Sequence, residues 1–190
     1  SPRIVRFFRT IGVPLVEVYG ATETSGVALG QKPDRLDPGS VGEPIVNVEA
    51  RVGADGELLL RGPTVFKGYY KNEAATEAAL RDGWLHTGDV VAVEDGQYRI
   101  VDRLKDIIVT GGENVASREV EEVLERHAAV ARVAVVGLPD ERWGEVVTAA
   151  IVLRPGTDAD PDDVVAELTG LAAAHLAGFK VPKRIQLVRE

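Results

Sequence analysis

The chain has 190 residues, of which 45% are hydrophobic and 27% are charged, a balance typical of a soluble globular protein rather than a disordered one. Its formal net charge is −8 at pH 7, with 12 basic and 15 acidic residues in 1–103 and 10 basic and 15 acidic residues in 104–190. Neither half therefore predicts the basic face that a nucleic-acid partner requires. The absence of cysteine excludes disulfides and thiolate metal sites.

No apolar run approaches the roughly 20 residues that cross a bilayer, and the opening residues S-P-R-I-V-R-F-F-R lack the apolar core of a signal peptide. We therefore expect a cytoplasmic protein without a transmembrane segment. A typical domain has about 100–150 residues, so the length allows one large or two small domains. The change of pattern described below favours two.

The first hundred residues are expected to be rich in β-strands. Residues 3–11 suggest a short helix, and an apolar strand at Pro14–Tyr19 runs directly into G-A-T-E-T-S-G. A hairpin is predicted where V-N-V-E-A-R-V and E-L-L-L-R flank the turn Ala54–Gly56. A short helix with an asparagine N-cap is predicted at Asn72–Leu80, and two further strands flank the turn Glu94–Gly96.

The segment Asp102–Gly112 combines charges, an apolar triplet and two glycines, and the sequence changes character after it. We therefore place a domain boundary near Leu104, which predicts domains at 1–103 and 104–190. Strands and helices alternate in the second domain, as is typical of a small α+β domain. Its expected elements are helices at Ser117–Arg126 and Asp162–Leu176 and strands at Val130–Leu138, Val146–Leu153 and Arg184–Val188.

The segment Y-G-A-T-E, Tyr19–Glu23, has the residue types of a nucleotide-binding loop. Gly20 permits a close turn, and the hydroxyl of Thr22 can meet a phosphate oxygen. Glu23 offers a hard carboxylate to Mg²⁺, and Tyr19 offers a flat face to a base. Taken alone, five residues of this kind more often form an ordinary polar turn.

Two later segments add residues that suit a nucleotide. In W-L-H-T-G-D, Asp89 follows a glycine at the end of a predicted strand, where a carboxylate can accept both hydroxyls of a ribose. The alternative is an aspartate in a turn. In D-R-L-K-D-I-I-V-T-G-G-E-N-V, Asp102–Val115, Arg103 can serve a ligand or a surface ion pair. The pair Gly111–Gly112 lets the backbone approach a ligand, or forms a turn before the next helix.

The order and wording of these segments resemble the superfamily of acyl-CoA synthetases, peptide-synthetase adenylation domains and luciferases. The resemblance continues through G-E-L-L-L-R-G-P-T-V-F-K-G-Y-Y-K-N, G-L-P-D-E-R-W-G-E and V-P-K-R-I, and it covers nearly the whole chain. Several linked motifs in order make the match specific. It implies an α+β fold in which the β-rich end of a large AMP-binding domain is followed by a small, mobile C-terminal domain.

The resemblance also implies a role for individual residues. Tyr19 would stack on adenine, with Gly20 and Ala21 beside it in the nucleotide loop. Thr22 would bind the adenylate phosphate and Glu23 would bind Mg²⁺. Asp89 and Arg103 would hold the ribose hydroxyls, and Lys105 would be the hinge. The loop Gly111, Gly112 and Glu113 would approach the pantetheine of coenzyme A, whereas Trp143 and Gly144 are interpreted as packing and turn residues.

The implied reaction is a ligation in two halves. A carboxylate attacks the α-phosphate of ATP to give an acyl-adenylate, and the thiol of coenzyme A then displaces AMP. The expected partners are a carboxylic acid, ATP with Mg²⁺, coenzyme A and the remainder of the large domain. By resemblance, a medium- or long-chain fatty acid is the first expectation for the acid and an aryl acid is the second.

Three parts of the family pattern do not occur in the 190 residues. These are the phosphate loop ending in P-K-G, most of the large domain, and the G-K that carries the adenylation lysine after V-P-K-R-I. Lys180 and Lys183 precede that last position and do not inherit its role. We therefore expect the small domain to be incomplete at its end, and the 190-residue chain alone to be inactive in adenylation.

Two other functions remain open from the sequence. The first is an adenylation domain that loads a carrier protein, although D-R-L-K-D differs from the G-R-x-D-x-Q wording common in such domains. The second is a non-catalytic nucleotide-binding module that keeps the fold without the reaction. The presence of Thr22, Glu23, Asp89 and Arg103 argues against this second function.

Overall fold

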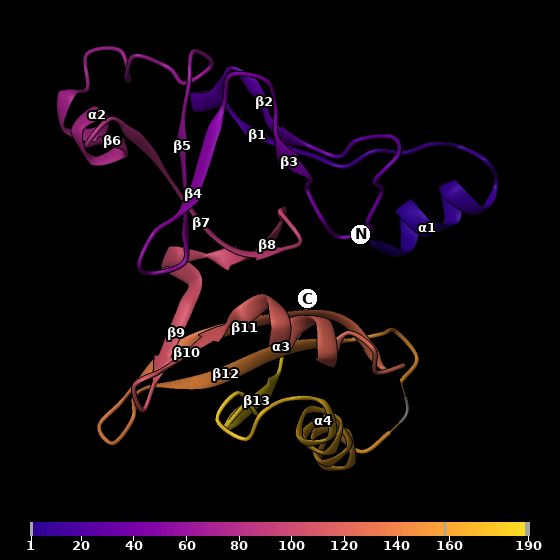
Figure 1. The fold of residues 1–190 in the computed structure, drawn as a ribbon. Helices are drawn as coiled ribbons and strands as arrows, with labels where there is room; N and C mark the ends of the chain where they lie inside the picture. The colour runs from indigo at the N-terminus through magenta and orange to yellow at the C-terminus, as the bar shows by residue number, and fades with distance from the viewer. Residues whose placement is uncertain (1, 158, 189–190) are drawn as a thin grey trace. The chain divides into compact units, whose positions relative to one another are not determined.

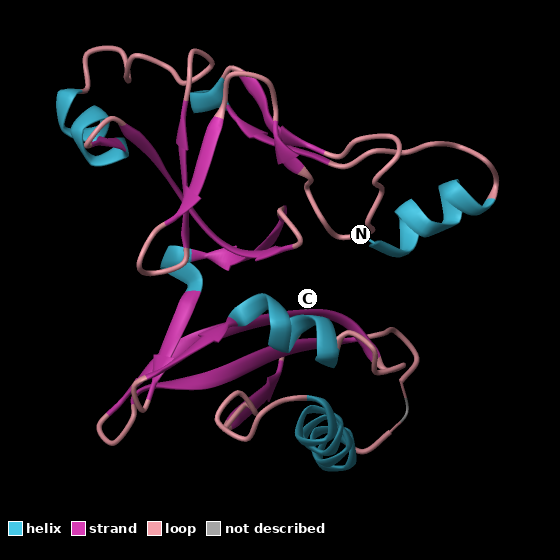
Figure 2. Ribbon diagram, in the orientation of Figure 1, coloured by secondary structure: helices cyan, strands magenta, loops and turns pink. Residues whose placement is uncertain are grey.

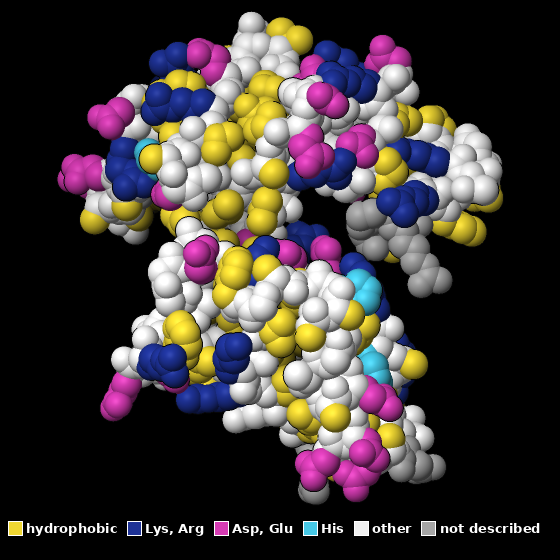
Figure 3. All heavy atoms as spheres, turned by 60° about the horizontal axis from the view of Figure 1, so that its bottom comes forward, with side chains coloured by type: hydrophobic (Ala, Val, Ile, Leu, Met, Phe, Trp, Pro, Cys, Tyr) yellow, Lys and Arg dark blue, Asp and Glu magenta, His cyan; other side chains and the backbone are white. Residues whose placement is uncertain are grey.

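A computed structural model describes residues 2–157 and 159–188. The fold is mixed α+β, as the sequence predicts, and the chain divides into two compact units, Ser1–Leu104 and Lys105–Glu190 (Figures 1 and 2). Among the residues described, no helix is long and apolar enough to cross a membrane. On the face drawn in Figure 3, basic side chains lie interspersed with acidic ones.

Over its described residues, 2–104, the first unit contains two antiparallel sheets and two short helices. The smaller sheet has the order β1-β2-β3, and the larger has the order β4-β5-β7-β6 with β8 paired to β7. The helices are α1 (Pro2–Thr10) and α2 (Glu73–Ala79). The strands are β1 (Val18–Ala21), β2 (Gly26–Gly30), β3 (Glu43–Pro44), β4 (Glu49–Val52), β5 (Glu57–Arg61), β6 (Leu80–Arg81), β7 (Trp84–Glu94) and β8 (Gln97–Arg103).

The core of this unit joins the two sheets. Leu58 and Leu60 on β5 are fully buried, and they pack in one cluster with Leu85 of β7 and with Ala28 and Leu29 of β2. Burial of a leucine side chain contributes about 1.5–3 kcal/mol, so this cluster is a main source of the unit's stability. It holds the strand pair that carries Tyr19 against the sheet that carries Asp89.

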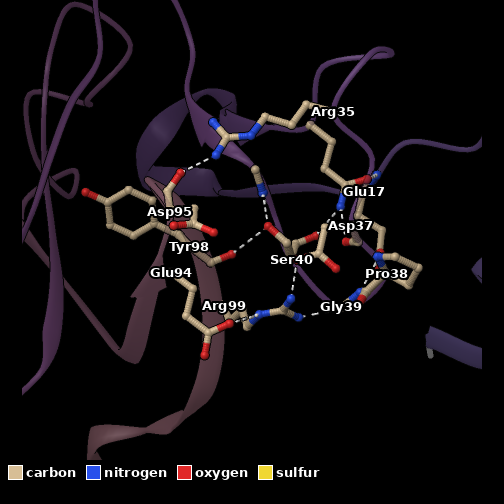
Figure 4. A network of polar contacts seen from close by, with 12 residues as sticks. Glu17, Arg35, Asp37, Pro38, Gly39, Ser40, Glu94, Asp95, Tyr98 and Arg99 are labelled. Carbon is tan, nitrogen blue, oxygen red and sulfur yellow. Dashed lines mark hydrogen bonds and ion pairs between the residues drawn. The ribbon is translucent and has the colours of Figure 1, made fainter.

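A polar network reinforces the same junction (Figure 4). The guanidinium of Arg99 on β8 bonds to the carboxylate of Asp37, and that of Arg35 bonds to the carbonyl of Asp95. The main chain of Tyr98 also pairs with residues 41 and 42, through the bonds Val41 N to Tyr98 O at 2.8 Å and Tyr98 N to Gly42 O at 2.9 Å. The loop after β2 is therefore tied to the β7–β8 hairpin.

Most of the elements predicted for residues 1–103 are present. The hairpin around Ala54–Gly56 is β4–β5, and the strands that flank Glu94–Gly96 are β7 and β8. The predicted N-cap is also confirmed, because the side chain of Asn72 accepts a 3.1 Å hydrogen bond from the amide of Ala75. Neither β2 nor β3 was predicted.

The predicted strand at Pro14–Tyr19 is wrong in its position. Residues 14–17 form no strand, and β1 begins at Val18, so Gly20 and Ala21 lie inside the strand rather than after it. In this segment a side chain, and not a neighbouring strand, bonds to a backbone carbonyl. The guanidinium of Arg9 donates to the carbonyl of Leu15 at 3.1 and 3.2 Å, which occupies an acceptor that a strand partner would use.

Over its described residues, 105–157 and 159–188, the second unit forms one five-stranded sheet with two helices. Its strand order is β10-β9-β12-β11, with β13 parallel to β12. A core of valine, isoleucine and leucine side chains lies between the sheet and the helices. The elements are β9 (Ile107–Thr110), β10 (Glu113–Ala116), α3 (Ser117–Leu124), β11 (Val130–Asp140), β12 (Gly144–Leu153), α4 (Pro161–His175) and β13 (Arg184–Leu187).

All five elements predicted for the second unit are present within two residues at each end. The β9–β10 hairpin was not predicted. Its turn is the pair Gly111–Gly112, and φ is +60° and +86° at the two residues. Two consecutive left-handed residues between antiparallel strands are typical of a tight hairpin turn, which explains why both positions are glycine.

Candidate nucleotide-binding site

A hollow of about 140 Å³ lies within the first unit. It brings together the end of β1, the turn that follows it, the loop before α2, and the facing parts of β7 and β8. It is lined by Tyr19, Ala21, Glu23, Tyr69, Leu85, His86, Thr87, Asp89 and Arg103. Five of these nine residues were named as site residues from the sequence alone: Tyr19, Ala21, Glu23, Asp89 and Arg103.

Asp89 is the centre of the hollow's polar contacts. The phenol of Tyr19 donates a 2.6 Å hydrogen bond to Asp89 Oδ2, and Arg103 Nε lies 2.9 Å from Asp89 Oδ1. Only 7% of Asp89 is exposed, so its two partners replace the water that burial removes. Burial, and then the bond to Asp89, raise the pKa of Tyr19 well above its ordinary value, so the phenol stays protonated and donates.

A β-bulge places Asp89 where these partners can reach it. Leu59 pairs with His86 and Glu57 pairs with Val90, so β7 advances four residues while β5 advances two. The additional residues belong to T-G-D, and Gly88 has φ +74°. Such bulges bend a strand and redirect a side chain, and they are frequent beside functional sites.

Threonine hydrogen bonds hold this bulge in place. The hydroxyl of Thr87 donates to the carbonyl of Leu58 at 2.8 Å and accepts from the amide of Asp89 at 3.1 Å. Across the hairpin, Asp89 pairs directly with Arg103 on β8. The ion pair between these two side chains therefore follows from strand register, which brings residues 14 positions apart to the same point.

Glu23 lies in the turn after β1, and its side chain meets Tyr69. The phenol of Tyr69 donates a 2.5 Å hydrogen bond to Glu23 Oε1. That bond is the largest cause of a lowered pKa at Glu23, so the carboxylate is ionised at neutral pH. Tyr69 is positioned in turn by Phe66, whose ring it meets edge to face at 4.8 Å between centroids.

The donor set suits magnesium better than a metal held by protein alone. Within the described residues, no group of three or more His, Cys, Asp or Glu side chains could hold a metal ion. Mg²⁺ in nucleotide enzymes is commonly bound through one or two carboxylates together with phosphate oxygens and water. A single ionised Glu23 at the wall of the hollow fits that pattern.

Two residues of the predicted loop have different surroundings from those expected. Gly20 is a strand residue rather than a turn residue, and a Cβ at this position would lie 1.7 Å from the carbonyl oxygen of Gly26. Glycine is required because β2 approaches closely. The side chain of Thr22 is exposed at the start of a 3-10 turn, Thr22–Thr24, and neither Gly20 nor Thr22 lines the hollow.

Thr24 has a structural role that the sequence did not reveal. It is fully buried, and its hydroxyl accepts from the amide of Ala21 at 2.8 Å. The same oxygen lies 2.9 Å from the carbonyl of Ala21 and 2.7 Å from that of Gly26. This hydroxyl therefore fixes the turn that presents Glu23.

The sequence also missed four residues that line the hollow: Tyr69, Leu85, His86 and Thr87. A signal was present for all of them, because Tyr69 lies in G-Y-Y-K-N and the other three lie in W-L-H-T-G-D, both part of the family wording. What the sequence could not show is that these segments meet Glu23 and Asp89 across the fold.

The remaining predicted site residues lie in the second unit. Lys105 is exposed and is the first residue of that unit, within a 3-10 turn, Leu104–Asp106. Gly111 and Gly112 form the β9–β10 turn, and Glu113 follows them, exposed, on β10. A Cβ at Gly111 would lie 2.9 Å from Cε3 of Trp143, which agrees with the packing role expected for that tryptophan.

Comparison with known families agrees with this geometry. Residues 1–70 match the family model described as AMP-binding enzyme, and residues 119–190 match the one described as AMP-binding enzyme C-terminal domain. The chain belongs to the adenylate-forming, AMP-binding enzyme family. The AMP-binding match includes Tyr19, Glu23 and Tyr69, and the C-terminal match covers most of the second unit.

Individual members of this AMP-binding family have similar sequences. A CoA ligase of Mycobacterium tuberculosis, named for a bicyclic indenyl-propanoyl group, is 46% identical over 179 residues, which are 92% of this chain and 34% of that protein. A long-chain-fatty-acid–CoA ligase of Bacillus subtilis is 39% identical over 198 residues, covering 97% of this chain and 35% of that protein. The chain thus spans about a third of the length of these two relatives.

A solved structure is similar over almost the whole chain. It is the o-succinylbenzoate CoA synthetase of Bacillus subtilis in complex with its acyl-adenylate intermediate, with a TM-score of 0.87 and 33% identity. The match covers 98% of this chain and 40% of that protein. The same enzyme in complex with ATP and magnesium ion matches with a TM-score of 0.82.

Proposed function

We propose that the chain is part of an acid–thiol ligase, which activates a carboxylic acid with ATP through an acyl-adenylate and transfers the acyl group to coenzyme A. One observation carries the proposal: an ion-paired, buried Asp89 and an ionised Glu23 line the same hollow in a chain whose relatives are CoA ligases. The hollow thus has an acceptor for ribose and an anion for the cation that accompanies a triphosphate.

In this proposal Asp89 accepts the ribose hydroxyls. Each of its carboxylate oxygens already receives one hydrogen bond, and each has a further lone pair for a ligand hydroxyl. Arg103 holds the carboxylate in place and also contributes donors for the ribose. The ring of Tyr19, fixed by its own bond to Asp89, offers the face on which adenine stacks.

Glu23 would hold Mg²⁺ together with the nucleotide phosphates. The cation neutralises charge on the phosphate oxygens when it is bound. The contribution of the chain is to keep Glu23 ionised and aimed, through the bond from Tyr69 and the buried Thr24 hydroxyl. Thr22 is proposed as a phosphate ligand, because its exposed hydroxyl begins the same turn.

The second unit is proposed to serve the thioester half of the reaction. Lys105 would act as the hinge, since it lies where one compact unit ends and the other begins. The glycine turn at Gly111 and Gly112 would approach the pantetheine arm, with Glu113 beside it. Two glycines without side chains leave the backbone accessible to such a ligand.

A medium- or long-chain fatty acid remains the proposed acyl substrate, with an aryl acid second. One similar ligase is named for long-chain fatty acids, and others are named for a bicyclic propanoyl group and for o-succinylbenzoate. Acyl-CoA formation by the complete enzyme, measured over a panel of these acids, tests the choice. A marked preference for aryl acids would overturn the fatty-acid proposal.

Calorimetric titration of the 190-residue chain with AMP tests the nucleotide site. We expect binding that Asp89→Ala weakens at least about tenfold, because hydrogen bonds to a charged group contribute about 1.5–3 kcal/mol. Asp34→Ala, at an exposed position in the loop between β2 and β3 and outside this hollow, serves as the control and should bind normally. Equal AMP affinity in wild type and Asp89→Ala would contradict the proposed site.

A further inference from the structure

The buried carboxylate of Glu57 has no part in the nucleotide contacts proposed above. Glu57 is the first residue of β5, and only 4% of it is exposed. A carboxylate removed from water is costly unless charged or hydrogen-bonding partners surround it. The hydrogen-bond partners of Glu57 therefore indicate its structural role.

Both oxygens of Glu57 bind β7 immediately before Asp89. Glu57 Oε2 lies 2.6 Å from Nδ1 of His86, and Glu57 Oε1 accepts from the amide of Gly88 at 2.8 Å. An ionised carboxylate can only accept, so the short contact assigns a proton to Nδ1 of His86. One side chain thus holds two of the three residues that precede Asp89.

We infer that Glu57 and His86 are positioning residues, which hold the bulge of β7 so that Asp89 faces Tyr19 and Arg103. The inference rests on the proposed nucleotide site, because Asp89 is assigned the ribose there. It gives a role to Glu57 and His86, which form no hydrogen bond with the side chain of Asp89 and are not assigned a contact with the ribose.

The geometry of the bulge explains why such a support is needed. Gly88 has φ +74° and lies where β7 has no one-to-one partner on β5. Its amide would lack an acceptor in the sheet ladder, and a glycine is the residue most free to change conformation. The carboxylate of Glu57 supplies that acceptor, so it removes the freedom at the residue adjacent to Asp89.

His86 extends the same support to the wall of the hollow. Its ring lines the hollow together with Thr87 and Asp89. With its Nδ1 held by Glu57, the ring has one orientation instead of several. A fixed ring keeps the shape of the wall beside Asp89, which is the contribution that supporting contacts make to a preorganised site.

The test uses the 190-residue chain and AMP. We expect Glu57→Ala to weaken AMP binding about tenfold or more, which is the effect of a lost charge-assisted hydrogen bond. Glu57→Gln should stay within about threefold of wild type, since its amide oxygen accepts from Gly88 and its amide nitrogen can donate to Nδ1 of His86 when the imidazole carries its proton on Nε2 instead. The matched control is Glu49→Ala, which removes an exposed carboxylate from β4 of the same sheet and should bind AMP normally.

Amide hydrogen exchange at Gly88 gives a readout that does not depend on AMP. Exchange should be slow in wild type and Glu57→Gln, and at least about tenfold faster in Glu57→Ala. If wild type does not bind AMP, the proposed nucleotide site fails, and the exchange rates alone decide the positioning inference.

His86 provides a second pair of variants, which decides the matter if Glu57→Ala does not fold. His86→Ala should weaken AMP binding and accelerate Gly88 exchange, and His86→Asn should restore both, because its side-chain amide can donate to Glu57 near the position of Nδ1. A folded Glu57→Ala, or His86→Ala, with wild-type AMP affinity and slow Gly88 exchange would overturn the inference. Equal loss of AMP affinity in Glu49→Ala would overturn it as well.

Discussion

The phenol of Tyr69 and the carboxylate of Glu23, 46 residues apart, share a 2.5 Å hydrogen bond at the wall of the hollow. The bond alters both groups: it lowers the pKa of Glu23 and raises the pKa of Tyr69. Tyr69 therefore keeps Glu23 ionised down to a lower pH than a free glutamate side chain would reach. In the proposed site, loss of this hydrogen bond would alter the carboxylate that holds Mg²⁺.

Tyr69→Phe should raise the pKa of Glu23 toward its ordinary value of about 4.3, because the largest cause of the lowering is removed. A depressed carboxylate pKa stabilises the fold above the unfolded pKa, and this contribution is lost as pH falls through the folded pKa. In Tyr69→Phe the contribution should therefore be smaller. Glu23 is partly exposed to solvent, so solvent screening keeps the effect on stability small.

Titration of the Glu23 side-chain carboxyl carbon by NMR measures this shift directly. Tyr70→Phe is the matched control, since Tyr70 is 88% exposed and is the adjacent residue in the sequence. An unchanged Glu23 titration in Tyr69→Phe would show that the bond is not formed in solution.

Tyr19→Phe should destabilise the first unit by about 1–3 kcal/mol. The substitution keeps the ring but leaves Asp89 Oδ2, on a side chain that is largely buried, without its phenol donor. A buried acceptor that loses its partner costs about that much. The free energy of unfolding in urea measures the loss.

A double-mutant cycle with Asp89→Ala, which removes both carboxylate oxygens, separates this bond from other effects of the phenol. The two substitutions should be non-additive by about 0.5–3 kcal/mol, because the residues share one hydrogen bond. Strict additivity would mean that the phenol stabilises the unit through contacts other than Asp89.

Much of the fold was predictable because its signals are local. The apolar run in E-L-L-L-R, which follows the turn Ala54–Gly56, predicts the strand whose Leu58 and Leu60 are buried, and Asn72 marks a helix start through a contact three residues away. The strand before Tyr19 was misplaced for the opposite reason. The guanidinium of Arg9 bonds to the carbonyl of Leu15, six residues away, and a side-chain contact of this kind leaves no periodic pattern in the sequence.

The residues of the candidate site likewise divide into those that the sequence predicts and those that only the folded chain reveals. Tyr19, Glu23 and Asp89 were found because family wording names them, and strand pairing explains why Asp89 meets Arg103. The supports of the site were not found. Tyr69 and Glu57 act across 46 and 31 residues, on Glu23 and on Gly88, and only the folded chain shows those contacts.

The 190-residue chain should be inactive in carboxylate-dependent exchange of pyrophosphate into ATP. Its sequence contains neither the P-K-G phosphate loop nor the G-K motif of the family, and it spans 34% and 35% of two similar ligases. Stabilising charge on the reacting phosphates requires hydrogen-bond donors and cationic groups beyond the hydroxyl of Thr22 and the magnesium ion that Glu23 would hold. Exchange at the rate of a complete ligase, measured in parallel with the same acids, would refute this expectation.

Gly20→Ala should destabilise the first unit severely, by about 3 kcal/mol or more. The added methyl would lie 1.7 Å from the carbonyl oxygen of Gly26, and that neighbour is backbone, which cannot rotate away as a side chain can. To relieve the clash, β1 and β2 would have to separate, which moves Tyr19 away from Asp89. Gly30→Ala is the matched control on β2 of the same sheet, because its methyl would meet Val18 Cγ1 at 3.7 Å and Ile45 Cγ2 at 3.9 Å, both ordinary van der Waals contacts. Thermal unfolding followed by circular dichroism should therefore show a large fall in Tm for Gly20→Ala and little change for Gly30→Ala. Equal changes in Tm would show that the close approach of β1 and β2 does not explain the glycine at position 20.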